Sequence, residues 1–267
     1  MASIPEALDR FRVDYAAHRA SEGRGYSGED LLRLPWLESG PFARQWAVRA
    51  RTFDAFVERV VTPMARAAAR PLRVLDLGAG NGWLCHRLAL QACDCVAVDI
   101  RDDCVDGLGA VSTFLEHARF DCFVAPFDEV PVADGFADLT IFNASLHYAT
   151  DLHASLAEAA RATRRGGTIA ILDSPFYARE GDGAAMVAEK HRRAGERFGA
   201  RAGNLLGLPF IEFLTADRLD RASQGLGLRW RRRRVLYPIW YELRPVVARL
   251  KRKRTPSRFD FWTAEVA

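Results

Sequence analysis

The sequence predicts an α/β fold in which helices flank a seven-stranded mixed sheet and further helices precede it as a lid. Three observations support this prediction. Apolar residues recur at helical spacing through the first 70 residues. From Arg73 to Asp173, five short β-rich runs alternate with helical stretches, as in the βαβ crossovers of a parallel sheet. Two more strand-like runs come late, the last near the C-terminus, so the sheet is expected to include an antiparallel strand.

The composition is that of an ordinary globular protein. The 267 residues are 49% hydrophobic and 27% charged, which is enough to bury a sizeable core and excludes a disordered chain. Charges run through the first 20 residues and no apolar run approaches a membrane span, so we expect no signal peptide and a cytoplasmic protein. The cysteines match no metal-site spacing, which predicts reduced thiols and no metal: Cys85, Cys93, Cys95, Cys104 and Cys122.

Residues 1–70 are expected to form the N-terminal helical lid and substrate region. Capping-box spacings begin at Ser3 and Ser27, and the Gly40-Pro41 pair separates them from a longer helix. One apolar stripe runs along this longer helix and predicts a single buried face: Phe42, Trp46, Phe53, Phe56, Val57, Val60 and Met64.

Residues 71–267 are expected to form the sheet domain, with helical insertions at about 175–212 and 238–257. The β-rich runs predict strands at 73–77, 95–100, 120–125, 138–142 and 168–172. Helical stretches between them are predicted at 84–91, 105–117 and 151–163. Beyond Asp173 the pattern predicts helices at 183–199, 216–225 and 239–252, and strands at 230–237 and 258–266.

A glycine-rich run after the first strand carries the clearest chemical signal. It reads Asp76-Leu77-Gly78-Ala79-Gly80-Asn81-Gly82 and leads from a buried strand into a helix. Glycines permit positive φ and let a ligand approach the backbone closely. The second strand ends in Asp99, whose carboxylate can accept both hydroxyls of a ribose. These residues therefore predict a nucleoside-containing ligand.

This Asp-x-Gly-x-Gly-x-Gly run, followed by Asp99, resembles the class I S-adenosylmethionine-dependent methyltransferases, in their small-molecule branch, and differs from the GxGxxG run of dinucleotide sites. The resemblance spans about 73–173 and includes Asp134-Gly135-Phe136-Ala137-Asp138 and Arg165-Gly166-Gly167. It implies a Rossmann-like fold and S-adenosyl-L-methionine as the cofactor. The cofactor-binding residues that it implies are Asp76, Gly78, Ala79, Gly80, Asn81, Gly82, Asp99, Ile100, Phe127 and Asn143.

The family assigns roles to these positions. It implies that Asp76 lies near the sulfonium and amino group of the cofactor and that Asp99 binds the ribose. The glycine run makes room for the methionine and ribose parts. Pro126 stands where the family often has an acidic residue beside the adenine, so Phe127 is expected to supply backbone or ring contacts there.

The fourth strand ends in the run Asn143-Ala144-Ser145-Leu146-His147-Tyr148, and loops beyond the carboxyl ends of strands are where such sheets bind ligands. Many small-molecule methyltransferases resemble this run in having a histidine here. With an unperturbed pKa near ~6.5, His147 is the candidate general base, although it can instead cap a helix or pack beneath the lid. Tyr148 is expected to orient substrate or to lie in the core, and the resemblance adds Ser145 and the lid residues His18 and Tyr26 to the substrate side.

The segment from Arg229 to Arg258 is electrostatically distinct. It holds twelve Lys/Arg and one acid, a net charge of +11, which leaves −7 for the rest of the chain. Its helical part predicts an amphipathic basic helix. Such a helix can bind an anionic membrane surface, an acidic carrier protein or RNA, or it can form part of a substrate pocket.

We therefore expect a methyltransferase that acts on an oxygen or nitrogen nucleophile of a small molecule, in specialised or envelope metabolism. Three alternatives stay open: an RNA or protein methyltransferase that docks through the basic segment, a non-catalytic cofactor-binding regulator, and a nicotinamide-dependent oxidoreductase. The run after the fourth strand lacks the Pro-Pro-aromatic pattern of base-N6 methylation, and no Pro-Cys pair supports cytosine C5 chemistry. The acceptor and the oligomeric state are not encoded in a motif.

Overall fold

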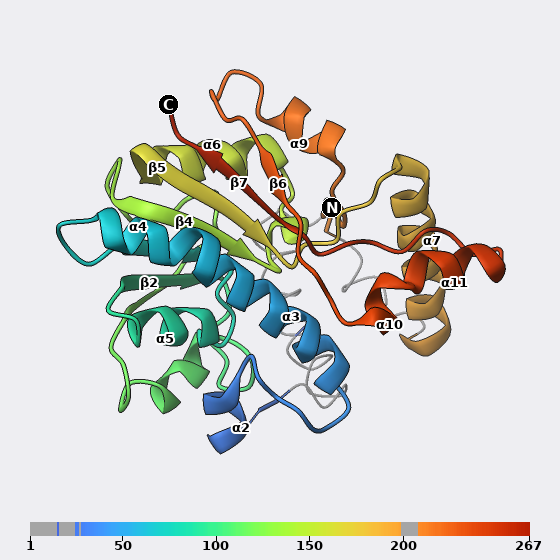
Figure 1. The fold of residues 1–267 in the computed structure, drawn as a ribbon, viewed down its shortest axis with the longest axis horizontal. Coiled ribbons are helices and arrows are strands. Elements are labelled where there is room, and N and C mark those ends of the chain that lie inside the picture. The colour runs from blue at the N-terminus through green and yellow to red at the C-terminus, as the bar shows by residue number, and fades with distance from the viewer. Residues whose placement is uncertain (1–14, 16–24, 27, 199–207) are drawn as a thin grey trace.

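A seven-stranded sheet runs through the centre of the computed structural model, which describes residues 15, 25–26, 28–198 and 208–267 (Figure 1). The strand order is β3-β2-β1-β4-β5-β7-β6. The first five strands are parallel: β1 (Arg73–Leu77), β2 (Asp94–Asp99), β3 (Asp121–Val124), β4 (Ala137–Asn143) and β5 (Thr163–Leu172). β7 (Phe261–Glu265) is antiparallel to β5, and β6 (Arg231–Arg233) is antiparallel to β7. The predicted seven-stranded mixed sheet is confirmed.

Alternate residues of the strands enter two hydrophobic cores, one on each face of the sheet. Val74 of β1 belongs to the core under α3 (Ala43–Phe56) and α5 (Trp83–Ala89), whereas Leu75 and Leu77 belong to the core under α6 (Leu152–Ala162) and α9 (Ala216–Ala222). Burial on both faces explains the continuous apolar runs of the central strands. α7 (Glu180–Phe198) lies to the side of the sheet, in the insertion after β5 (Figure 1).

The predicted long helix of the N-terminal region is confirmed. It is continuous through α3 (Ala43–Phe56), the π-helical turn Val57–Val61 and α4 (Thr62–Ala67), and it crosses one face of the sheet (Figure 1). Its apolar stripe is buried against that face. The short α2 (Gly28–Arg33) precedes it, and the helix predicted from Ser3 lies outside the described residues.

The prediction of a helix at 105–117 is wrong. In this stretch the chain forms only a short 3-10 helix, Leu108–Thr113. Two glycines explain the difference. A Cβ on Gly109 would lie 2.6 Å from the carbonyl oxygen of Asp102, and one on Gly107 would lie 2.8 Å from the Asp103 carboxylate. The loop before this helix therefore packs too tightly against it for a regular α-helix.

Two predicted elements near the C-terminus are shorter than expected. β6 stops at Arg233, because the backbone of Val235 is bound by side chains: its N–H donates to Asp260 at 3.0 Å and its carbonyl accepts from Arg258 at 2.9 Å. The basic helix is divided at Leu243 into α10 (Ile239–Glu242) and α11 (Arg244–Leu250). No helix among the residues that the structure describes is long and apolar enough to cross a membrane.

Candidate active site

Two adjoining cavities open at the carboxyl ends of the parallel strands, where the topology of such sheets places ligands. The glycine-loop cavity has a volume of about 510 Å³ and is lined in part by Gly78, Ala79, Gly80 and Asn81. The arginine cavity, about 450 Å³, is named after three of its lining residues, Arg44, Arg49 and Arg244. The two cavities share the wall residues Tyr15, Gln45, Arg49, Ala144 and Tyr148.

The glycine loop is bound to the neighbouring strand through its backbone. The N–H groups of Gly78 and Ala79 both donate to the carbonyl of Val98, at 2.7 and 3.0 Å. Gly78 has φ +77°, and a Cβ there would lie 2.3 Å from the Cβ of Ser145. Gly78 is therefore required both by its conformation and by the close approach of the loop after β4. Asn81 and Gly80 line the cavity beside it.

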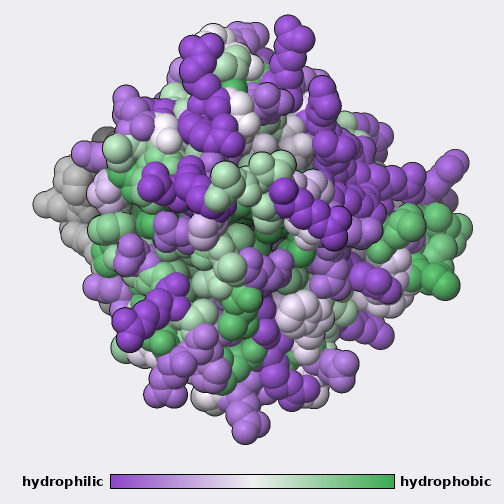
Figure 2. All heavy atoms as spheres, turned by 60° about the vertical axis from the view of Figure 1, so that its left-hand side comes forward, coloured by the Kyte–Doolittle hydropathy of each residue, from purple (hydrophilic) through white to green (hydrophobic). Residues whose placement is uncertain are grey.

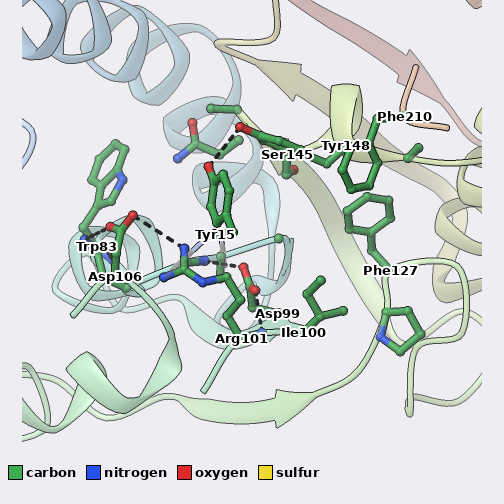
Figure 3. Close-up of a pocket in the computed structure, with 18 of the residues that line it drawn as sticks. Tyr15, Trp83, Asp99, Ile100, Arg101, Asp106, Phe127, Ser145, Tyr148 and Phe210 are labelled. Atoms are coloured by element: carbon green, nitrogen blue, oxygen red, sulfur yellow. Dashed lines mark hydrogen bonds and ion pairs between the residues drawn. The ribbon is translucent and has the colours of Figure 1, made fainter. Parts of the chain in front are cut away.

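Asp99 lies at the end of β2, at the rim of the glycine-loop cavity (Figure 3). Its Oδ2 accepts from the Gly80 N–H at 2.7 Å, and its Oδ1 accepts from the Arg101 N–H at 2.8 Å. Burial raises the pKa of Asp99, and these two hydrogen bonds oppose the rise. Each oxygen keeps a free lone-pair direction, so the carboxylate can still accept hydrogen bonds from a pair of ligand hydroxyls.

The remaining walls of this cavity contain the other predicted cofactor contacts. Ile100 follows Asp99, and Phe127 lies on the opposite side, edge-on to Phe142 with ring centroids 5.7 Å apart (Figure 3). The buried Oδ1 of Asn143 has no hydrogen-bond partner among the described residues. A buried amide oxygen in this state is costly, so a ligand that donates a hydrogen bond would stabilise it.

Two of the predicted contacts, Asp76 and Gly82, line neither cavity. The Asp76 carboxyl is fully buried in β1. Burial and the nearby Asp99 raise the pKa of Asp76 to about 8, so the group is mostly protonated at neutral pH. A direct contact between Asp76 and the cofactor remains a prediction.

The residues predicted for the substrate side gather around the glycine-loop cavity. Tyr26 lines it and accepts a hydrogen bond from Trp46 Nε1 at 2.6 Å. Ser145 lines it too, and its hydroxyl donates to the Leu77 carbonyl at 2.5 Å. The hydroxyls of Tyr15 and Tyr148 are 2.9 Å apart, so their side chains meet between the two cavities (Figure 3). His18 lies outside the described residues.

His147 lines the arginine cavity and not the glycine-loop cavity. Burial, together with the charges of Lys190 and Arg49, lowers its pKa to about 3. The unperturbed pKa assumed from the sequence therefore does not hold, and the imidazole is neutral at neutral pH. Its Nδ1 is buried without a partner among the described residues. A neutral imidazole with so low a pKa accepts a hydrogen bond well but is a weak base.

Asp173 is a site residue that the sequence reasoning missed. It follows β5 directly, lines the arginine cavity, and has a buried Oδ1 without a partner in the described part of the chain. Burial raises the pKa of Asp173 to about 6, although Arg49 and Thr52 oppose the rise. Its φ is +50°, and that of Ala144 after β4 is +57°. Strained backbone of this kind gathers at functional sites. The strand-end rule that identified Asp99 would also have identified Asp173.

Three guanidinium groups make the arginine cavity cationic. Arg44 and Arg49 come from α3, and Arg244 comes from α11. Arg244 lies over the Tyr241 ring at 3.6 Å and donates to the Ser257 carbonyl at 2.7 Å. Arg44 is 5.7 Å from the Trp240 ring centroid. Sequence alone marks the two α3 arginines only as the polar side of a helix.

Comparisons with known proteins agree with this geometry. A family model described as a methyltransferase domain matches residues 75–171. Malonyl-(acyl-carrier protein) O-methyltransferase of Hahella chejuensis is 24% identical over 214 residues, 75% of this chain and 68% of that protein. The protein of the same name from Geobacter sulfurreducens is 29% identical over 193 residues, 67% of each chain.

A solved structure shares the fold. It is 1,6-didemethyltoxoflavin-N1-methyltransferase of Burkholderia thailandensis, with 1,6-didemethyltoxoflavin and S-adenosylhomocysteine bound. It matches with a TM-score of 0.55 at 15% identity and covers 100% of this chain and 92% of that one. The sheet order, the glycine loop joined to Asp99 and the matched domain lead to one conclusion. Residues 75–171 form a methyltransferase domain of the class I, S-adenosylmethionine-dependent kind, and the chain that carries it is an enzyme whose cofactor is S-adenosyl-L-methionine.

Proposed function

We propose that the enzyme methylates an oxygen or nitrogen nucleophile of an acid-bearing small molecule that binds in the arginine cavity. The observation that carries this proposal is that the two cavities adjoin and share lining residues, among them Tyr15, Ala144 and Tyr148. A nucleophile in the arginine cavity would lie next to a cofactor in the glycine-loop cavity. Such positioning is the main source of rate in a displacement between two bound molecules.

The residues of the glycine-loop cavity suit the cofactor. The Asp99 carboxylate can hold the ribose hydroxyls, Ile100 and Phe127 can flank the adenine, and Asn143 Oδ1 can accept from the amino group. When bound, S-adenosylmethionine supplies an electrophilic methyl group on a sulfonium. The protein's part is to hold that group dry and aligned with the acceptor.

Asp173 is the group we propose as the proton acceptor. With a pKa of about 6, its carboxylate is mostly ionised at neutral pH and its Oδ1 faces no competing donor among the described residues. As the nucleophile attacks, the bond between sulfur and the methyl carbon breaks, and the proton of the hydroxyl or amine passes to Asp173. Neutral His147 would accept a hydrogen bond from the acceptor and orient it. A carboxylate acceptor would need no base.

The charge of the arginine cavity suggests the class of acceptor. Among the described residues that line it, there are three guanidinium groups and one carboxylate, that of Asp173. Guanidinium groups bind carboxylates and phosphates by paired hydrogen bonds. The two bacterial relatives are named as O-methyltransferases of malonyl-(acyl-carrier protein). A malonyl group carries a carboxylate, which supports an acid-bearing acceptor in this chain as well.

The direct test uses purified enzyme, isotope-labelled S-adenosylmethionine and extracts divided into small molecules, RNA and protein. We expect label in an acidic small-molecule fraction, on oxygen or nitrogen, as determined by mass spectrometry. Label in RNA or protein alone would replace this proposal with the docking alternative. Tight binding of S-adenosylhomocysteine without any labelled product would instead indicate a regulator.

A further inference from the structure

The outer surface of α10 and α11 is the most unusual surface of the molecule. An apolar stripe on these helices points away from the protein. Its members recur every three or four residues: Ile239, Leu243, Val246 or Val247, and Leu250. Ile239 is 77% exposed and Leu250 is 79% exposed. In the same segment Tyr241 alone is buried. The amphipathic helix predicted from the sequence is therefore present as two short helices, and its apolar side faces outward.

This apolar stripe is part of a larger exposed group, which we name the docking patch. Its apolar members are Leu236, Ile239, Trp240, Leu243, Val246, Val247 and Leu250. Figure 1 shows α10 and α11 at the edge of the molecule beside α7, and Figure 2 shows hydrophobic side chains projecting at the right-hand rim next to hydrophilic ones. Monomeric proteins rarely expose so continuous a group of large apolar side chains unless it binds something.

Cations follow the apolar stripe directly. Four exposed cations lie at the end of the stripe: Arg249, Lys251, Arg252 and Lys253. None of them forms an ion pair with any residue that the structure describes. By contrast, Arg254 and Arg258 are engaged by Glu189 and Glu242. The cations beside the stripe are thus available for a partner, whereas those nearer the core stabilise the fold.

We infer that the docking patch binds the surface of an anionic lipid bilayer. Aliphatic side chains at this exposure gain from entering the acyl region, Trp240 suits the interface, and the adjacent cations attract anionic headgroups. RNA phosphates would bind the cations, but the aliphatic stripe would stay exposed to water. A convex, protruding helix pair also fits a flat bilayer better than it fits a groove.

The position of the docking patch links it to the arginine cavity. Trp240, Tyr241 and Arg244 line that cavity from the same two helices. A bilayer under α10 and α11 would therefore lie beside the cavity mouth, where an amphiphilic acceptor can enter. Membrane binding itself does not depend on the proposed reaction, so it is tested without turnover.

The test is sedimentation of the full chain with phosphatidylcholine vesicles, with and without phosphatidylglycerol, at low and high salt. We expect binding to the anionic vesicles that weakens with salt. Ile239→Ser with Leu250→Ser should weaken it about ten-fold per side chain, and Lys251→Gln with Lys253→Gln about five-fold per cation. The control variants Leu90→Ser and Arg221→Gln change exposed residues outside the patch and should leave binding unchanged.

The scarcity of lysine gives a second readout on the unmodified protein. The chain has three lysines, Lys190, Lys251 and Lys253. Among the residues that the structure describes, Lys190 is paired with Glu212 at 2.7 Å and the other two form no ion pair. Anionic vesicles should protect Lys251 and Lys253 from an amine-reactive reagent and leave Lys190 unchanged.

Three outcomes would overturn the inference. One is no binding to anionic vesicles at low salt. Another is binding that the serine variants leave intact, because the stripe would then play no part. The third is a dimer, seen by light scattering, that the serine variants dissociate, because the patch would then be covered by a second copy.

Discussion

The two cavities of the active site are built in different ways. In the glycine-loop cavity, one part of the lining is the backbone of a short stretch, Gly78–Asn81, which the Gly78 and Ala79 N–H bonds to Val98 hold in place, and the rest is side chains from other elements. The arginine cavity is formed by side chains from α3, the ends of β4 and β5, and α10 and α11. The difference teaches that a cavity built partly on a local backbone motif leaves a signal in the sequence, whereas a cavity built from distant side chains is assembled only by the tertiary fold.

Gly78→Ala should have the largest effect on this comparison, because it affects the backbone cavity itself. The new methyl would meet the Ser145 Cβ at 2.3 Å in a left-handed conformation. We expect cofactor binding to be lost and unfolding to be easier, as measured by calorimetry with S-adenosylhomocysteine and by urea denaturation.

Gly225→Ala is the matched control, since Gly225 has φ +81° and no atom within 4 Å of an added Cβ. It should cost only about 1–2 kcal/mol of strain. Adding Ser145→Gly to Gly78→Ala should restore part of the binding. If Gly78→Ala behaves like the control, the close approach of the two loops does not matter.

Asp173→Asn should impair the arginine cavity while leaving the glycine-loop cavity unaffected. We expect kcat to fall about 100-fold or more while the Kd for S-adenosylhomocysteine stays unchanged. In the parent enzyme, kcat should rise with pH through about 6, because the carboxylate must lose its proton to act as a base. The flat pH profile of a carboxylate acceptor would contradict the assigned role. Asp220→Asn, an exposed change, is the control.

The same variant should raise stability. The pKa of Asp173 is about 6 in the folded protein against an ordinary 3.8, so the folded state holds the proton over that interval and stability falls as pH rises through it. Above pH 6 the buried charge costs about 3 kcal/mol, which Asn does not incur. Urea denaturation on either side of this interval measures the gain.

Asp99→Asn should act on the glycine-loop cavity alone. An amide keeps one acceptor oxygen but cannot accept on both sides as the carboxylate does from Gly80 and Arg101. We expect affinity for S-adenosylhomocysteine to fall about 10- to 100-fold. Asp94→Asn, at the exposed start of β2, should leave affinity unchanged. If Asp99→Asn and the parent enzyme bound S-adenosylhomocysteine with equal affinity, Asp99 would not bind the ribose.

Arg44→Gln should raise KM for the acidic acceptor about ten-fold, with little change in kcat or in cofactor affinity. The residue is exposed on α3 and is not needed for the core, so folding should be preserved. Steady-state kinetics with the acceptor found in the labelling experiment measures the effect. An unchanged KM would argue against charge recognition.

His147→Gln should have the smallest effect, a few-fold loss of kcat, because glutamine can still form hydrogen bonds. With a pKa of about 3, His147 contributes no titration to the profile at about pH 5 to 8. The pH profile of the variant should therefore match that of the parent. A lost inflection near ~6.5 would restore His147 as the base.

Much of the fold was predictable because its signals are local. β1 begins and ends as the apolar run indicates, and β2 and β3 differ from prediction by one residue at each end. The failures lie where distant groups decide the backbone. Gly107 and Gly109 pack against an earlier loop, and Arg258 and Asp260 bind the backbone that would have extended β6. No local pattern in the sequence records such contacts.

The candidate site divides in the same way. Asp99 was predicted because it ends a strand that the sequence displays, and Ile100 and Phe127 were predicted from the family resemblance; all three line one cavity. Asp173 was missed although it follows a predicted strand. Arg44 and Arg244 could not be identified from the sequence, because nothing in it shows that the start of α3 lies beside Trp240 of α10, or that Arg44 and Arg244 line the same cavity.

The position of β7 has a consequence for how the molecule folds. β7 lies between β5 and β6, so Ile171 pairs with Trp262 across a long stretch of chain. Closing such a loop is slow in comparison with the neighbouring pairings of β1 and β2. The half that contains the glycine loop can thus assemble first, and the arginine cavity, which includes Trp240, Tyr241 and Phe259 from the segment before β7, is completed only when that strand is inserted.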